Sequence, residues 1–293
     1  MTRHPIGRRS PQQRRHARAG LLFIAPALLA IGLFVLLPLV GAIALSFTDW
    51  ALVGTPTPNG LSNYRSLAAD PQFKASLVVT AKVAVGLAIP AALFSFALAV
   101  VMNSGVRRSS AYQTILFLPA VLPSVVTTIV WGAMYQGDGV INTIIGAEVP
   151  WLTNSRLALP AIIFLMIWTN LGYYTIITLA GVRDVPYDVL EAASVDGAGA
   201  WRRMWHITLP LVRPVLLFVV VVATTDALTL FVQPYLLTQG GPGDSTRTLS
   251  ELIYETAFSF GNVGKASAMA VVLLVITLLV ALVQFRLLRS RED

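Results

Sequence analysis

The stretch "GLLFIAPALLAIGLFVLLPLVGAIALSF", residues 20–47, carries no charged side chain and exceeds the roughly 20 apolar residues that cross a bilayer. Hydrophobic residues make up 56% of the 293-residue chain and charged residues only 12%, a balance that a soluble globule cannot shield from water. The stretch is too long for the apolar region of a signal peptide, and no clear small-residue cleavage site follows it. We therefore interpret it as a retained membrane helix.

Five further apolar runs follow at similar length. Together the six runs predict an all-α integral membrane protein with six transmembrane helices, over residues 20–47, 75–102, 111–134, 157–182, 212–236 and 266–288. A basic arm, residues 1–19, precedes this six-span unit of residues 20–288, and a short tail, residues 289–293, follows it.

The positions of arginine and lysine predict the orientation. If the N-terminus is cytoplasmic, fifteen of these residues fall on cytoplasmic segments and five on external loops, with Lys82 inside a span. This bias predicts that both termini lie in the cytoplasm, and we expect the chain in the cytoplasmic (inner) membrane. The net charge of +7 then reflects topology, so we expect the basic arm to meet anionic lipid and no nucleic acid.

Several chemistries are excluded by the residues present. The chain has no cysteine and only three scattered histidines, which gives no basis for a metal site. The nearest approach to a phosphate-binding loop is "SFGNVGKAS", residues 259–267, in which Ser259 replaces the first glycine and Ala266 replaces the required serine or threonine. Neither Gly-x-Ser-x-Gly nor His-Glu-x-x-His occurs. We expect no enzyme activity and no cofactor in this chain.

The loop between the fourth and fifth runs reads "RDVPYDVLEAASVDGAGAWRRMWHITLPL", residues 183–211, and is called the hook below. Asp184 and Pro186 suit the first turn of a short helix, which Asp196 and Gly197 should end. A second short helix should then run to Pro210, with a face made of Trp201, Met204, Trp205 and Thr208. The sequence therefore predicts two short helices that meet at a glycine bend.

Two roles fit such a hook. Its tryptophan, methionine and arginine content suits a helix that lies in a groove of a partner protein. The alternative is a pair of interfacial helices on the inner leaflet, with tryptophan at headgroup depth.

A family resemblance favours the partner role. The hook resembles the coupling signature of binding-protein-dependent ABC importer permeases, which reads Glu-Ala-Ala, three residues, Gly, nine residues, Ile, any residue, Leu-Pro. The matching residues are Glu191, Ala192, Ala193, Gly197, Ile207, Leu209 and Pro210. Asp196 and Trp201 extend the match to the carbohydrate-uptake subfamily, as does "YLLTQGGPGDSTRTLSELIYETAF", residues 235–258. The resemblance covers residues 20–288.

The resemblance implies a set of partners. They are a second, similar permease, two cytoplasmic ATPase subunits that bind ATP and Mg²⁺, and an external solute-binding protein or lipoprotein. The hook would dock into a cleft of the ATPase, where the residue matching Glu191 makes a polar contact and Gly197 forms the bend. The solute would be a sugar or a related polyol compound, and a glycerophosphodiester stays open as well.

Polar residues inside the runs mark two candidate solute sites. Asp226 lies deep in the fifth run, where an ionised carboxylate facing lipid costs about 2.5 to 3.5 kcal/mol, so it should face protein or water. With Thr225 and Gln233 it either lines a polar path or only holds helices together, with Lys82 as a candidate partner. Asn170, Tyr173 and Tyr174 offer amide and ring surfaces for a hydroxyl-rich solute, or pack helices with their hydroxyl groups bonded to backbone.

Other aromatic and loop residues allow two readings each. Trp131 and Tyr135 fit an aromatic belt at the outer membrane surface better than a sugar platform. The segments "SNYRSLAADPQF", residues 62–73, and "LTQGGPGDST", residues 237–246, are either plain turns or a docking surface for the binding protein. Against the importer stands one other class, a self-contained channel or secondary carrier that uses Asp226 and Lys82 as a charge relay.

Overall fold

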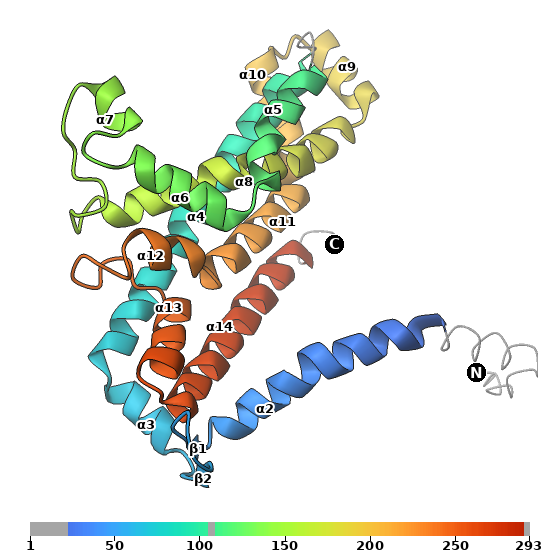
Figure 1. Cartoon of the computed structure of the whole chain (residues 1–293). Helices are drawn as coiled ribbons and strands as arrows, with labels where there is room; N and C mark the ends of the chain where they lie inside the picture. The colour runs from blue at the N-terminus through green and yellow to red at the C-terminus, as the bar shows by residue number, and fades with distance from the viewer. Residues whose placement is uncertain (1–22, 105–108, 290–293) are drawn as a thin grey trace, which may run out of the picture.

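The computed structural model describes residues 23–104 and 109–289, and helices dominate it (Figure 1). Among these residues the one sheet is a two-stranded antiparallel ribbon that pairs Thr48 with Pro58 and Asp49 with Thr57. The predicted all-α class is confirmed. In chain order the elements are η1 (Gly32–Leu36), α2 (Leu37–Leu45), β1 (Thr48–Asp49), β2 (Thr57–Pro58), α3 (Ser62–Ala69), α4 (Pro71–Asn103), α5 (Ser109–Val121), α6 (Ser124–Met134), α7 (Val140–Ile145), α8 (Ala158–Arg183), α9 (Tyr187–Val195), α10 (Ala200–Arg203), η2 (Met204–Thr208), α11 (Leu209–Leu228), α12 (Val232–Leu237), α13 (Leu249–Tyr254), η3 (Glu255–Ser259) and α14 (Val263–Arg289).

Five helices in the described part of the chain are long and apolar enough to cross a membrane. They cover Phe23–Leu45, Pro71–Asn103, Ala158–Arg183, Ala200–Leu228 and Val263–Leu287. The first diverges from the rest of the bundle, and its apolar window buries no residue inside the chain (Figure 1). The basic arm lies outside the described residues, as do residues 290–293 of the tail.

The third predicted span, residues 111–134, is not one straight helix. It consists of α5 and α6, which are bent by 96° relative to each other at a short break. Pro123 lies in this break with an extended backbone, ψ 129°, and precedes the first turn of α6. A proline has no N–H to donate to the preceding turn, which ends α5 here. Either half alone is shorter than a spanning helix, so a sixth span exists only if the bent pair crosses together.

The fifth predicted span, residues 212–236, is wrong at both ends. The helix begins at Ala200, inside the hook, and ends at Leu228. Thr229 leaves helical geometry, and the short α12 starts after the break at Val232. The polar residues predicted for one span are therefore divided between the end of α11 and a separate helix.

The core lies where α4, α8 and α11 pack together. Its fully buried residues include Val83 and Leu87 of α4, Ile162 of α8 and Val219 of α11. A polar contact crosses the same core, because the Thr178 hydroxyl donates to Ser95 Oγ over 3.1 Å and both residues are completely buried. The three helices therefore form the scaffold on which the other segments are placed.

Gly172 sets how closely α5 can approach α8, and its replacement tests this packing. A Cβ atom at Gly172 would lie 1.9 Å from the Leu116 carbonyl oxygen, which belongs to backbone and cannot rotate away. We expect Gly172→Ala to destabilise the fold by roughly 1–3 kcal/mol. Thermal unfolding of the purified chain, followed by tryptophan fluorescence, should show a lower midpoint. Gly41→Ala is the matched control, since nothing lies within 4 Å of its added methyl group, and equal midpoints for both variants would refute the close approach.

The end of the bundle opposite the hook gathers β1, β2, α3, α13 and the start of α14 (Figure 1). Asp70 caps α4 by accepting hydrogen bonds from the backbone N–H groups of Gln72 and Phe73, and it also accepts one from Lys265 Nζ at 2.8 Å. Partial burial opposes ionisation, but these bonds hold the pKa of Asp70 below its ordinary value. The ion pair thereby joins the first turns of α4 and α14.

Candidate functional site

The hook is a helix, a tight bend and a second helix, as the sequence predicts. Its first limb, α9, ends with a bend in which the Gly197 N–H donates to the Ser194 carbonyl oxygen and the Ala198 N–H to that of Ala193. This is the Schellman arrangement, which needs a residue with positive φ, and Gly197 has φ +75°. The bend therefore depends on glycine at position 197.

Two details of the predicted hook are wrong. Asp184 does not lie in the first turn of α9, because it caps the end of α8 and Pro186 is the residue that precedes α9. The second limb does not end at Pro210 either, since α10, η2 and α11 form one helix from Ala200 to Leu228. Pro210 follows the π-helical turn η2, where the wider backbone tolerates the missing donor. The second limb is thus the start of a membrane-length helix.

The hook exposes large apolar side chains. Trp201, on the second limb, is 72% exposed, and Val195, on the first limb, is 84% exposed. The rings of Trp201 and Trp205 meet edge to face, with centroids 5.6 Å apart. Glu191, Ala192, Asp196 and Pro210 are also exposed, and Ala193, Ile207 and Leu209 are partly buried. This chain alone therefore leaves the signature residues available to a partner.

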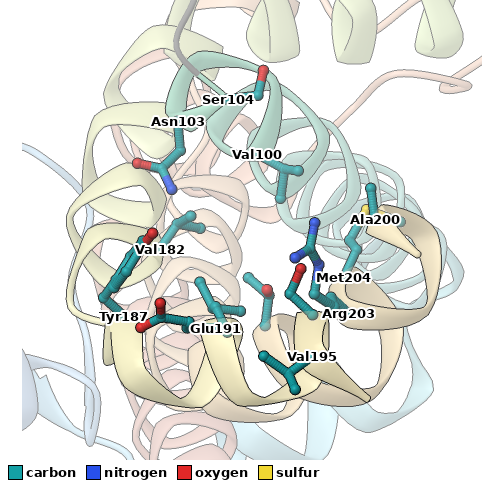
Figure 2. Close-up of a pocket in the computed structure, with 13 residues that line it drawn as sticks. Val100, Asn103, Ser104, Val182, Tyr187, Glu191, Val195, Ala200, Arg203 and Met204 are labelled. Atoms are coloured by element: carbon teal, nitrogen blue, oxygen red, sulfur yellow. The ribbon is translucent and has the colours of Figure 1, made fainter. Parts of the chain in front are cut away.

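A cavity of about 600 Å³ separates the hook from the last turn of α4. Figure 2 shows Tyr187 and Glu191 next to each other on α9, and Arg203 extending toward the same space from the second limb. Asn103 lines it from the α4 side. The hook thus contacts the bundle through Leu190, Met204 and Leu209 and leaves this cavity beside the end of α4.

The deep carboxylate of α11 has a partner that the sequence does not identify. The Tyr174 hydroxyl of α8 donates to Asp226 Oδ2 over 2.9 Å, and Tyr174 itself is completely buried. Within the described residues no ion pair joins Asp226 to Lys82, which is exposed on α4. The hypothesis that Lys82 holds Asp226 is wrong, and Tyr174 fills that structural role. A solute role for Asp226 stays a prediction, because its side chain is only half-buried.

The other predicted pathway residues do not form one cluster of contacts. The side chains of Thr225 and Asn170 each bond to a backbone carbonyl one turn earlier, that of Val221 and that of Met166. Gln233 is buried in α12, beyond the break that ends α11. Tyr173 is 39% exposed and lies beside Tyr174, with ring centroids 5.8 Å apart. Tyr173 thus keeps a ring surface for a solute or for lipid.

Trp131 and Tyr135 do not form an aromatic belt. Trp131 is 6% exposed and Tyr135 is 5% exposed, because both pack against α8. The Tyr135 hydroxyl donates to the Ala161 carbonyl oxygen over 2.9 Å. The bend between α5 and α6 carries the two rings inward, which explains why a straight third span predicts the wrong environment for them.

One buried polar group, at the end of the bundle opposite the hook, is not predicted from the sequence. Glu251 of α13 is completely buried, and neither of its carboxylate oxygens has a hydrogen-bond partner among the described residues. Its neighbourhood includes Arg247, whose Nε lies 3.1 Å from Glu255 Oε2. The sequence shows only a charged segment between two apolar runs, and the burial of Glu251 follows from how α13 packs.

Membrane-length helices around a common core, with an exposed hook at one end, define a multi-pass membrane protein. Residues 84–292 match a protein family described as "Binding-protein-dependent transport system inner membrane component". The chain belongs to that family. The match covers the core helices, the hook and α14.

Individual relatives agree over nearly the full length. The chain is 34% identical to a probable ABC transporter permease protein of Bacillus subtilis, over 95% of this chain and 93% of the relative. It is 35% identical to the lactose transport system permease protein of Rhizobium radiobacter, over 97% and 98%. Its fold resembles a chain of the bacterial alginate ABC transporter crystallised with a periplasmic protein bound to an alginate pentasaccharide, with a TM-score of 0.81 at 22% identity over 94% and 96%.

The family decides between the two function classes. Its members are membrane subunits of ABC importers, which work with ATPase partners. The chain is accordingly an ABC importer permease and not an enzyme, and nothing in the comparisons supports a self-contained channel or carrier.

Proposed function

We propose that this permease passes a sugar or a related polyol compound across the cytoplasmic membrane, driven by ATPase subunits that dock on the hook. The observation that carries the proposal is the exposed hook, where the residues of the coupling signature surround a glycine bend. The relatives include a lactose permease, which supports the carbohydrate class. The decisive test is uptake of labelled sugars by the assembled importer in proteoliposomes, with and without ATP.

The proposed assembly follows from the topology. In this proposal both termini and the hook, residues 183–211, face the cytoplasm, as the bias of arginine and lysine predicts, so the opposite end with α3 and the 238–248 loop faces outward. A second permease, two ATPase subunits that hold ATP and Mg²⁺, and an external solute-binding protein complete the importer. We propose that the binding protein docks on residues 62–73 and 237–246, which this orientation puts on the external side. Cysteine labelling from either side of intact cells tests the orientation.

The solute path is proposed to run beside Asp226, with contributions from Thr225, Tyr173, Tyr174 and Asn170. Asp226 has one oxygen bonded to Tyr174, and the half-buried carboxylate retains capacity to accept a hydrogen bond from a solute hydroxyl group. Gln233 on α12 and Lys82 on α4 would contact the solute only at the edges of this path. Ligand binding to the partner solute-binding protein will distinguish a sugar from a glycerophosphodiester, since only the latter brings a phosphate charge.

The chain alone should not hydrolyse ATP. Residues 259–267, the nearest sequence to a phosphate-binding loop, fall on η3, a bend and the first turns of α14, and Lys265 is bonded to Asp70. We expect phosphate release by the purified chain to equal that of a detergent blank, and to appear when the ATPase subunits are added. Robust hydrolysis by the chain without its partners would refute the assignment.

A further inference from the structure

Glu251 lies in an environment that disfavours an ionised carboxylate. It is completely buried, and neither oxygen has a hydrogen-bond partner of good geometry among the described residues, although the Thr248 backbone N–H lies close enough to favour the carboxylate. An ionised group in such a site loses its hydration with little compensation, whereas the neutral acid loses far less. The burial is provided by the chain itself, and α13 is not one of the membrane-length helices.

The charged groups around Glu251 come from three segments. Glu255 of η3, with Arg247 and Asp244 of the 238–248 loop, acts on it electrostatically, and Tyr235 of α12 lies close enough to be affected in return. Arg247 forms ion pairs with Glu255 and Asp244, and none with Glu251 is found among the described residues. The elements behind α13 are uncharged where they meet it, with Leu67 of α3, Phe73 of α4 and Met269 of α14.

These surroundings favour the neutral acid. Burial and the nearby Glu255 carboxylate raise the pKa of Glu251 from its ordinary 4.5 to about 7, although Arg247 and the Thr248 backbone N–H oppose the shift. If opening of α13 returns the pKa to its ordinary value, the closed state is most stable below pH 4.5. Its stability then falls as the pH rises toward 7 and is constant above that.

The residues at the start of α13 are hydrogen-bonded to the end of α11. The Thr248 hydroxyl donates to the Leu230 carbonyl oxygen over 2.8 Å, and the Ser250 hydroxyl donates to that of Leu228 over 3.4 Å. The Leu249 N–H donates to Thr80 Oγ1 of α4 over 2.9 Å. Any loosening of α13 therefore releases contacts to α11 just beyond Asp226, and to α4.

We propose that Glu251 is a proton-binding latch: as a neutral acid it keeps α13 and the 238–248 loop packed on the end of α11, and as a carboxylate it releases them. The side of the membrane on which the latch senses pH rests on the proposed function and topology. The change of packing itself does not depend on them.

Hydrogen–deuterium exchange of the full chain in lipid nanodiscs tests the latch without any transport measurement. After division by the intrinsic exchange rate, opening of residues 238–255 should rise by up to about tenfold per pH unit between pH 5 and 7 and then level off. Glu251→Gln keeps the shape and removes the charge, so its exchange should not vary with pH. A wild-type profile without this rise, or a Glu251→Gln variant that retains it, would overturn the proposal.

Glu255→Gln gives an independent check. Because the Glu255 carboxylate raises the pKa of Glu251, its neutralisation should move the levelling point to lower pH, and an unchanged profile would contradict the assignment. Uptake by the assembled importer at varied external pH is the functional counterpart. Loss of all sugar uptake at every pH would count against the proposed function, and the exchange profile would still decide on the latch.

Discussion

Gly197→Pro should nearly abolish ATP-driven uptake while the permease still folds and inserts. Proline fixes φ near −65°, whereas Gly197 has φ +75°, and it also removes the N–H that donates to Ser194. The Schellman bend cannot form, so the angle between the two limbs of the hook must change. A loss of about 3 kcal/mol in docking would weaken ATPase binding by about 100-fold. Solute uptake and co-purification of the ATPase from membranes should fall together.

Gly199→Ala is the matched control for that variant. Gly199 lies two residues further along the hook with φ −62°, and an added methyl group would meet nothing within 4 Å. It should therefore retain the ATPase and transport normally. Normal uptake and ATPase retention in Gly197→Pro would show that the hook is a membrane-surface element, and the coupling assignment would have to be abandoned.

Glu191→Lys tests the same surface through charge. Glu191 is exposed in the isolated chain, so the substitution should leave folding unchanged and act only in the complex. Burying a reversed charge in the proposed ATPase cleft typically costs several kcal/mol. We expect reduced co-purification of the ATPase with an unchanged yield of permease. An unaffected complex would remove Glu191 from the interface.

Asp226→Ala should reduce uptake by tenfold or more, on the order of the 1.4 kcal/mol or more lost with one solute hydrogen bond to a charged group. The same change leaves the buried Tyr174 hydroxyl without its acceptor, which also weakens the contact of α8 with α11. The alanine variant alone therefore mixes a solute effect with a packing effect.

Two further variants separate these effects. Asp226→Asn keeps an acceptor for Tyr174 and removes the charge, so it should assemble normally and still transport poorly. Tyr174→Phe removes the hydroxyl and keeps the ring, so it should assemble with a modest loss of thermal stability. If Asp226→Asn transports normally and Asp226→Ala fails to assemble, Asp226 serves only to hold the bundle together.

Much of this architecture follows from local chemistry. Apolar runs predict membrane helices because a helix pairs all its backbone polar groups internally, as the hydrocarbon core requires. A glycine after α9 predicts a bend because few other residues adopt positive φ. The breaks are harder to place, since Pro90, Pro119 and Pro214 lie within helices whereas Pro123 ends one. Neighbouring helices decide which missing hydrogen bond is tolerated, and that depends on packing far along the chain.

The candidate site also has parts that the sequence predicts and parts that it does not. The hook is local in sequence, and the spacing of its signature residues is sufficient to place them. The partner of Asp226 lies 52 positions away in another helix, and several polar side chains in the runs could have served equally well. Glu251 is not distinguished by any motif, because its burial depends on three segments that meet only in the folded chain.

The continuity of the hook with α11 makes the two proposed functional ends parts of one mechanical element. From Trp201 to Asp226 the helix runs 25 residues, roughly 38 Å at 1.5 Å per residue. A tilt of about 5° about the hook end would displace the Asp226 end by about 3 Å over that length. This is enough to break the bond to Tyr174. If an ATPase subunit docks on the hook as proposed, a small rotation of that subunit would be transmitted along this helix to Asp226 without a chain of intermediate side-chain changes.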